Sequence, residues 1–132
     1  MADQTWQYRS EPLVTAMKVL VCGGRKYRNW SKVADTLRAL HAETPIDLLI
    51  HGCAPGADTL AARWAYLVGV RERGFAADWD AHGKAAGPMR NQRMLTEGKP
   101  DLVVAFPGGD GTADMVRRAE AAGVKYRLIE DT

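Results

Sequence analysis

Residues 101–112 read D-L-V-V-A-F-P-G-G-D-G-T and carry the clearest indication of the fold class. Its first half, 101–106, is a short apolar run rich in valine, which predicts a buried strand. The proline and glycines that follow end the strand. A helix is then predicted from Asp114 to Ala122, with Gly123 closing it. A strand that passes through a glycine turn into a helix indicates a parallel α/β sheet.

The same order of strand, glycine turn and helix occurs twice earlier in the chain. M-K-V-L-V-C from Met17 predicts the first strand, and a helix follows with Asn29 or Ser31 as its N-cap. I-D-L-L-I-H, residues 46–51, predicts the second strand, and residues 57–68 have the spacing of a second amphipathic helix. The sheet is therefore built from repeated crossover units.

The remaining segments complete the sheet. Residues 70–79 are compatible with a short strand weakened by an internal glycine, Pro88 suits the first turn of another helix, and residues 124–129 predict a terminal strand. Because helices alternate with strands, we expect a single Rossmann-like three-layer α/β sandwich with about five parallel strands. Residues 17–132 form this domain, and residues 1–16 are interpreted as an N-terminal extension.

The composition is that of an ordinary globular protein. The 132 residues are 46% apolar and 26% charged, and the net charge of +2 is too small to indicate bulk attraction to nucleic acid or membrane. No stretch approaches the roughly 18 apolar residues of a membrane span. The first residues do not resemble a signal peptide, so we expect a cytoplasmic protein. Cys22 and Cys53 fit no paired motif and are expected to be free, buried, structural thiols.

Glycine clusters follow three of the predicted strands, at the edge where parallel α/β sheets bind ligands. We expect the backbone N–H groups of these turns and the positive ends of the helices behind them to form a phosphate cradle. The alternative is that the glycines only turn corners. The candidate ligand-binding residues are Gly23, Gly24, Arg25, Gly52, Gly56, Asp58, Arg90, Asn91, Pro107, Gly108, Gly109, Asp110, Gly111 and Thr112. Neither a P-loop nor a G-x-G-x-x-G fingerprint is present.

Several polar side chains near these turns have two interpretations. Arg25, Lys26 and Arg28 could close over a phosphate or form a solvated basic loop. Asp58 could cap its turn or accept a ribose hydroxyl, and capping is favoured. Thr112 could cap its helix or donate to a phosphate.

Aromatic and histidine residues add further candidates. Trp79 and His82 could stack on a base, although packing is the default for any aromatic side chain. His51 ends an apolar strand and is interpreted as a hydrogen-bonded core histidine. The sequence predicts no metal site and no resident cofactor.

P-G-G-D-G-T resembles the P-G-G-x-G-T signature of the SLOG superfamily, which includes the Lonely Guy phosphoribohydrolases and DprA. The stretches V-C-G-G-R, H-G-C-A-P-G-A-D, A-D-W, A-A-G-P-M-R-N-Q-R-M and A-F-P-G-G-D-G-T-A-D-M-V look most like the YspA branch of YpsA-related proteins. They lie between residue 17 and about residue 129. The resemblance implies a Rossmann-like fold that binds a nucleotide-derived ligand.

The resemblance also bears on catalysis. Lonely Guy enzymes use an arginine, which Arg90 resembles, and a glutamate whose position falls on Met115. Asp114 lies one residue earlier and about 100° around the helix, so it cannot simply substitute. It is expected instead to stabilise the helix N-terminus electrostatically or to pair with Arg118 four residues later. Arg90 thus remains the single catalytic candidate, and hydrolysis is disfavoured.

We therefore expect binding of a phosphorylated nucleotide-derived ligand such as AMP, ADP-ribose or NAD. The alternative is a nucleotide N-glycosidase that releases base from a nucleoside 5′-monophosphate through Arg90 and another carboxylate. Single-stranded DNA binding is less favoured, because no basic stripe studded with aromatics is present. Related proteins often pair through helices, so the resemblance makes a homodimer an expectation.

Overall fold

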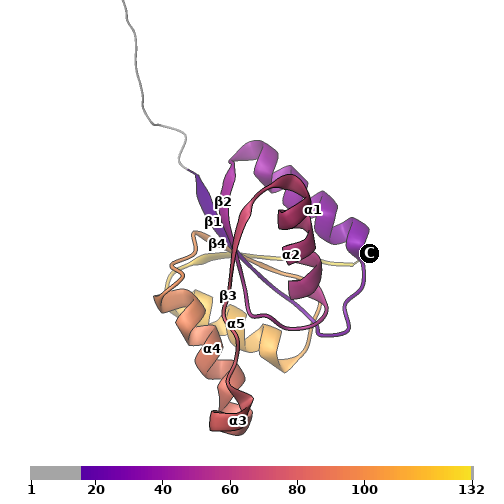
Figure 1. Cartoon of the computed structure of the whole chain (residues 1–132). Coiled ribbons are helices and arrows are strands. Elements are labelled where there is room, and N and C mark those ends of the chain that lie inside the picture. Colours follow the sequence, from indigo (N-terminus) through magenta and orange to yellow (C-terminus); the bar gives the residue numbers. More distant parts are fainter. Residues whose placement is uncertain (1–15, 132) are drawn as a thin grey trace, which may run out of the picture.

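The computed structural model describes residues 16–131 and contains one five-stranded, all-parallel sheet in the order β3-β2-β1-β4-β5 (Figure 1). Its strands are β1 (Met17–Cys22), β2 (Ile46–His51), β3 (Arg71–Gly74), β4 (Leu102–Ala105) and β5 (Lys125–Leu128). Strand order reverses between β1 and β4. The expected α/β sandwich is confirmed, and all but the last residue of the predicted extension 1–16 lies outside the described residues.

Helices cover both faces of the sheet (Figure 1). The α1 (Trp30–Glu43) and α2 (Ala57–Val68) helices pack on one face, and α4 (Ala86–Thr96) and α5 (Asp110–Ala121) pack on the other. The short α3 (Trp79–His82) and the 3-10 turn η1 (Gly83–Ala85) lead into α4. Among the residues from 16 to 131, none of these helices has the length and apolar character needed to span a bilayer.

The central strand β1 supplies both halves of the core. Val19 and Val21 face α1 and α2, whereas Leu20 and Cys22 face α4 and α5, and all four are buried. A strand buried on both faces has no polar alternation, which explains the continuous apolar run in its sequence. This rigid centre holds the ends of β1 and β4 side by side.

Two helix starts are decided by the structure. The Asn29 side chain accepts a hydrogen bond from the Lys32 amide at 3.0 Å, so Asn29 and not Ser31 caps α1. The predicted start of α5 at Asp114 is wrong, because the helix begins at Asp110. The Ala113 amide already donates to the Gly109 carbonyl at 3.0 Å, and the D-G-T of the glycine motif therefore forms the first helical turn.

Candidate functional site

The turns after β1 and β4 meet at the point where strand order reverses. The Gly24 amide donates to the Pro107 carbonyl at 2.8 Å, and the Phe106 amide donates to the Cys22 carbonyl at 2.9 Å. A cleft of about 920 Å³ opens over these two turns. This volume lies within the roughly 300–1,000 Å³ typical of small-molecule sites, at the position where α/β sheets bind their ligands.

Two glycines allow the turns to pack this closely. A Cβ atom on Gly108 would lie 2.2 Å from Thr112 Oγ1 and 2.7 Å from the Gly24 amide nitrogen. Gly56 has a φ of +81°, and its Cβ would lie 2.1 Å from the Gly24 carbonyl oxygen. The Ala57 amide donates to that same oxygen at 3.1 Å. Gly56 thus joins the turn after β2 to the turn after β1.

The N-terminus of α5 opens on the cleft. Residues 109–112 line it, and the N-cap, Gly109, makes no side-chain hydrogen bond to the first turn. The first amides of a helix have no intrahelical acceptor, and the helix dipole adds positive potential at this end. An anion in the cleft would therefore meet free N–H donors without displacing a cap.

Asp58 holds the loop after β2. Its carboxylate accepts hydrogen bonds from the amides of Gly52 at 2.8 Å and Ala54 at 3.3 Å, and the residue is 5% exposed. Burial raises the pKa of Asp58, and the two amide bonds together with His51 and Arg90 counteract that rise. Asp58 does not cap α2, whose N-cap Gly56 has no side-chain hydrogen bond; its carboxylate instead binds the loop before the helix and lines the cleft.

Asp58→Ala is expected to lower the free energy of unfolding by about 2 kcal/mol, because two inward-facing amides lose their acceptor. Asp58→Asn should retain most of the stability, because its side-chain oxygen can still accept. Urea denaturation measures both values. Equal losses in the two variants would contradict this role for the carboxylate oxygen.

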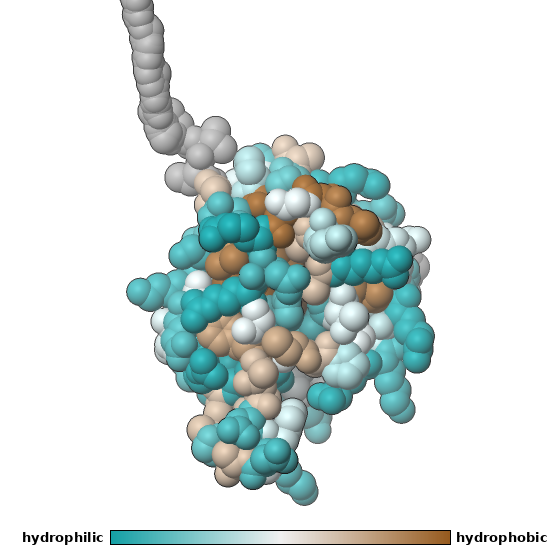
Figure 2. Space-filling view, in the orientation of Figure 1, coloured by the Kyte–Doolittle hydropathy of each residue, from teal (hydrophilic) through white to brown (hydrophobic). Residues whose placement is uncertain are grey.

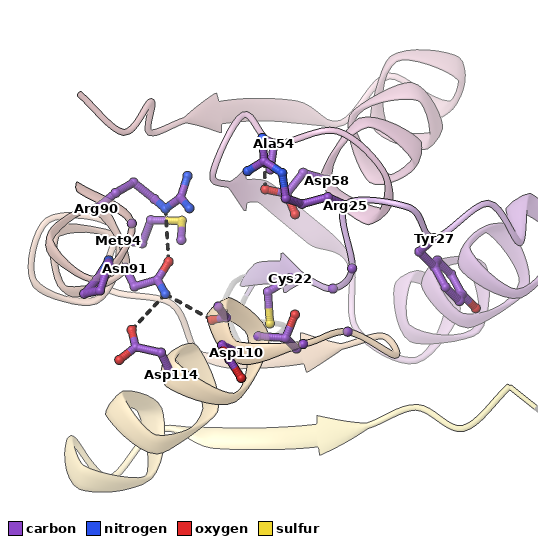
Figure 3. A pocket seen from close by; sticks show the side chains of 18 of the residues that line it. Cys22, Arg25, Tyr27, Ala54, Asp58, Arg90, Asn91, Met94, Asp110 and Asp114 are labelled. Atoms are coloured by element: carbon purple, nitrogen blue, oxygen red, sulfur yellow. Dashed lines mark hydrogen bonds between the residues drawn. The ribbon is translucent and has the colours of Figure 1, made fainter. Parts of the chain in front are cut away.

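Arg90 and Asn91 bring α4 to the cleft (Figure 3). The Arg90 guanidinium donates to the carbonyl of Gly52, to that of Phe75 at 3.5 Å, and through Nε to Asn91 Oδ1 at 3.0 Å. Burial lowers the pKa of Arg90, and Asp58 opposes that effect. A Cβ on Gly52 would lie 2.5 Å from the guanidinium, so this glycine makes room for the arginine.

Asn91 joins α4 to α5. Its Nδ2 donates to the Gly111 carbonyl at 3.2 Å and to Asp114 Oδ2 at 3.0 Å, and the residue is buried. Its side-chain oxygen Oδ1 accepts from Arg90, so both the oxygen and the nitrogen of the Asn91 side-chain amide are hydrogen-bonded. Asn91 therefore braces Arg90 and the start of α5.

Asp114 pairs with Arg118 at 2.8 Å, as predicted, and also with Arg117 at 3.5 Å. Although partial burial raises its pKa, hydrogen bonds from Arg118 and Asn91 and the charges of both arginines bring the net pKa below the usual aspartate value. Met115, at the Lonely Guy glutamate position, is fully buried in the core. A side chain at position 115 therefore faces the core and not the cleft.

The structure brings most of the predicted site together. The predicted residues that line the cleft are Gly23, Gly24, Arg25, Asp58, Arg90, Asn91, Pro107, Gly108, Gly109, Asp110, Gly111 and Thr112. Gly52 and Gly56 are not among the lining residues and act through packing. Lys26 lines the cleft whereas Arg28 does not, and Trp79 lines it whereas His82 does not.

Other lining residues were missed by sequence reasoning, among them Tyr27, Lys84 and Arg117. Arg117 follows Asp110 and Asp114 at helical spacing, and this shared face of α5 is the sequence signal that could have indicated it. Tyr27 gave no such signal, because its position depends on a tilted contact with the Phe106 ring 5.6 Å away.

The expectations for His51 and for the two cysteines have different outcomes. His51 is hydrogen-bonded as expected, with Nε2 2.6 Å from Glu72 Oε1 and Nδ1 accepting from the Cys53 amide. Both cysteines are free, and burial raises the pKa of Cys22 to about 12, so it stays a thiol. Cys53 was expected to be buried and is exposed, because it lies beyond the end of β2, in a turn where its φ is +59°.

Comparison with known proteins identifies the family of this chain. Residues 17–82 match the model of the YspA, cpYpsA-related SLOG family (YAcAr). The protein belongs to this family. The part that matches the YAcAr model contains the first two glycine turns and Asp58, and it ends beyond Trp79.

Two relatives extend the comparison beyond the matched part. The Gene 61 protein of Mycobacterium phage D29 is 39% identical over 117 residues, which cover 81% of this chain and 91% of the phage protein. The structure of DNA processing protein A (DprA) from Streptococcus pneumoniae aligns with a TM-score of 0.69 and 19% identity, covering 89% of this YAcAr chain. The chain spans only about half of that DprA chain, 51%, and at this identity the likeness concerns the fold. The expected SLOG membership is confirmed, and the expected likeness to DprA is confirmed for the fold.

Proposed function

We propose that the protein binds a small phosphorylated nucleoside, of the kind represented by AMP, ADP-ribose and NAD, in the cleft between β1 and β4. The observation that carries this proposal is the meeting of the two glycine turns with the uncapped first turn of α5. Backbone amides and a helix N-terminus at one place provide donors for a phosphate group. A glycine surface also lets that group approach the backbone closely.

The charges that line the cleft support an anionic ligand. The cations are Arg25, Lys26, Lys84, Arg90 and Arg117, and the carboxylates are Asp58, Asp110 and Asp114. Asp114 is paired with two arginines, and Asp58 is engaged by two amides, which leaves Asp110 as the most exposed of the three carboxylates. The cleft lining thus has two more cations than carboxylates, although the net charge of the whole chain is only +2.

Thermal unfolding in the presence of AMP, ADP-ribose, NAD, adenosine or ribose 5-phosphate tests the proposal. At about 100 times its Kd a ligand stabilises the folded state by about 2.7 kcal/mol, which raises Tm by several degrees. We expect this for at least one phosphorylated nucleoside and not for adenosine. Inorganic phosphate and matched ionic strength serve as controls. A flat panel at millimolar concentrations would contradict the proposal.

A second candidate, hydrolysis of the N-glycosidic bond, is favoured by one observation. The Asp58 carboxylate lines the cleft, and Arg90 is close enough to affect its pKa. Asp58 would be the proton-transfer group, because the Lonely Guy glutamate position is the buried Met115. Chromatography of AMP and NAD incubated with the protein should reveal free base if this activity exists. Binding without release of base would remove hydrolysis and leave the first proposal standing.

A further inference from the structure

Trp79 lines the cleft from the short helix α3. It opens α3, whose N-cap Asp78 accepts a hydrogen bond from the Ala81 amide at 3.0 Å, so the turn that carries the indole is held in place. In Figure 1 this helix projects beyond the sheet beside the start of α4. Figure 2 shows that the projecting end carries a mixture of hydrophilic and moderately apolar residues and no continuous hydrophobic patch.

One edge of the indole rests on a glycine. A Cβ on Gly87 would lie 3.2 Å from Trp79 Cη2 and about 4 Å from its Cζ2 and Cζ3 atoms. The six-membered ring therefore packs on the backbone in the first turn of α4, next to Pro88. This contact orients the ring without enclosing it, because Trp79 remains 49% exposed.

The exposed part of Trp79 belongs to the cleft wall. Trp79, Gly87 and Pro88 all line the cleft, and none of the three presents a charged group. The backbone donors proposed for the phosphate come from other elements, the turn after β1 and the first turn of α5, to which Lys84 of η1 and Arg90 of α4 add cationic side chains. One cleft thus has an anion-binding part and an aromatic part.

We propose that Trp79 stacks on the planar heteroaromatic base of the ligand while the phosphate lies at the glycine turns. This inference rests on the proposed function and adds the part of the site that selects nucleotides over sugar phosphates. Stacking between a base and an aromatic side chain tolerates different bases, because every base has a π-face. The apolar part of the lining, formed by Trp79, Gly87 and Pro88, therefore favours ligands that contain a base but does not distinguish one base from another.

Calorimetric titration of AMP and ribose 5-phosphate into wild-type protein, Trp79→Phe and Trp79→Leu tests the inference. Trp79→Leu should weaken AMP binding by about 10- to 100-fold and leave ribose 5-phosphate within about twofold, while Trp79→Phe keeps most of the affinity. Tyr66→Leu removes an aromatic residue that is 83% exposed at the far end of α2 and should change neither affinity. AMP should quench the tryptophan fluorescence of the wild type more than that of Trp79→Phe.

The outcomes separate this inference from the proposed function. Equal losses for AMP and ribose 5-phosphate would overturn stacking and make Trp79 a support of the fold. Unchanged AMP affinity in Trp79→Leu, with ribose 5-phosphate still bound, would overturn stacking and leave the phosphate site in place. Adenosine that quenches Trp79 where ribose 5-phosphate does not bind would support the aromatic wall and overturn the phosphate site. Wild-type protein that binds none of these compounds would overturn both.

Discussion

Gly56→Ala is expected to lower the free energy of unfolding by roughly 4 kcal/mol. The residue has φ +81° and ψ −125°, a backbone conformation that costs a residue with a side chain about 1–3 kcal/mol. The new Cβ would also lie 2.1 Å from the Gly24 carbonyl oxygen and 2.6 Å from the Arg25 carbonyl carbon. Both are backbone atoms and cannot rotate away, so overpacking adds about 1–3 kcal/mol. Urea denaturation measures the loss.

Gly69→Ala provides the control at the other end of the same helix. Gly69 has a nearly identical φ of +82°, lies in the left-handed helical region, and has no atom within 4 Å of its added Cβ. Its substitution should cost about 1 kcal/mol, the penalty of the left-handed conformation alone. A loss in Gly56→Ala within 1 kcal/mol of the Gly69→Ala value would show that the two turns are not packed as described.

Because Gly56 positions the turn after β1, a folded Gly56→Ala protein should also bind phosphorylated ligands more weakly. The added methyl group would push the Gly24 carbonyl and the start of the Arg25 loop away from α2. The amides and the basic side chain of that loop would then leave the cradle. Gly69→Ala should bind like the wild type, since Gly69 is outside the cleft lining.

Arg90→Gln is expected to weaken the binding of AMP by about 100-fold, because charged hydrogen bonds to phosphate are strong and the guanidinium lies half-buried in the cleft. Calorimetric titration measures the change. The AMP affinity of Arg90→Lys should lie between those of the wild type and Arg90→Gln. An ammonium group keeps the charge, but it cannot bind the carbonyls of Gly52 and Phe75 as a planar guanidinium does.

Arg93→Gln is the matched control on the same helix. Arg93 pairs with Glu97 at 3.0 Å on the exposed side of α4 and does not line the cleft. The substitution removes the same charge from the protein, so it accounts for any general electrostatic effect. Equal losses of affinity in Arg90→Gln and Arg93→Gln would contradict a specific role for Arg90 at the ligand.

Much of the fold could be predicted because its signals are local. The apolar run of β4, the glycine turn after it and the amphipathic spacing of α1 and α2 each lie within a few consecutive residues. Alternation of such segments leaves parallel pairing as the consistent arrangement. The weak strand prediction for residues 70–79 is confirmed only for β3, Arg71–Gly74, a short edge strand whose residues are exposed, whereas Trp79 opens α3. The low apolar content of β3 made it hard to recognise.

The candidate site was only partly predictable, because its residues are defined by contacts across the fold. Sequence alone indicated that Arg90 and the glycine turns would meet, yet it could not assign Gly52 to the packing of Arg90. It treated Trp79 and His82 alike, whereas only Trp79 reaches the cleft. It also started α5 four residues late, and it did not identify Arg117 as a cleft residue.

The succession of strands and helices, the parallel sheet and the glycine-rich ends of the strands follow from the amino-acid sequence, because hydrophobic spacing and backbone freedom are properties of neighbouring residues. The contacts of the site glycines and charged side chains depend on the folded structure. Gly56 and Gly69 have almost the same φ, but only Gly56 faces another segment of backbone. That difference arises from the distance between residues 24 and 56 in space, which depends on how the whole sheet brings its turns together.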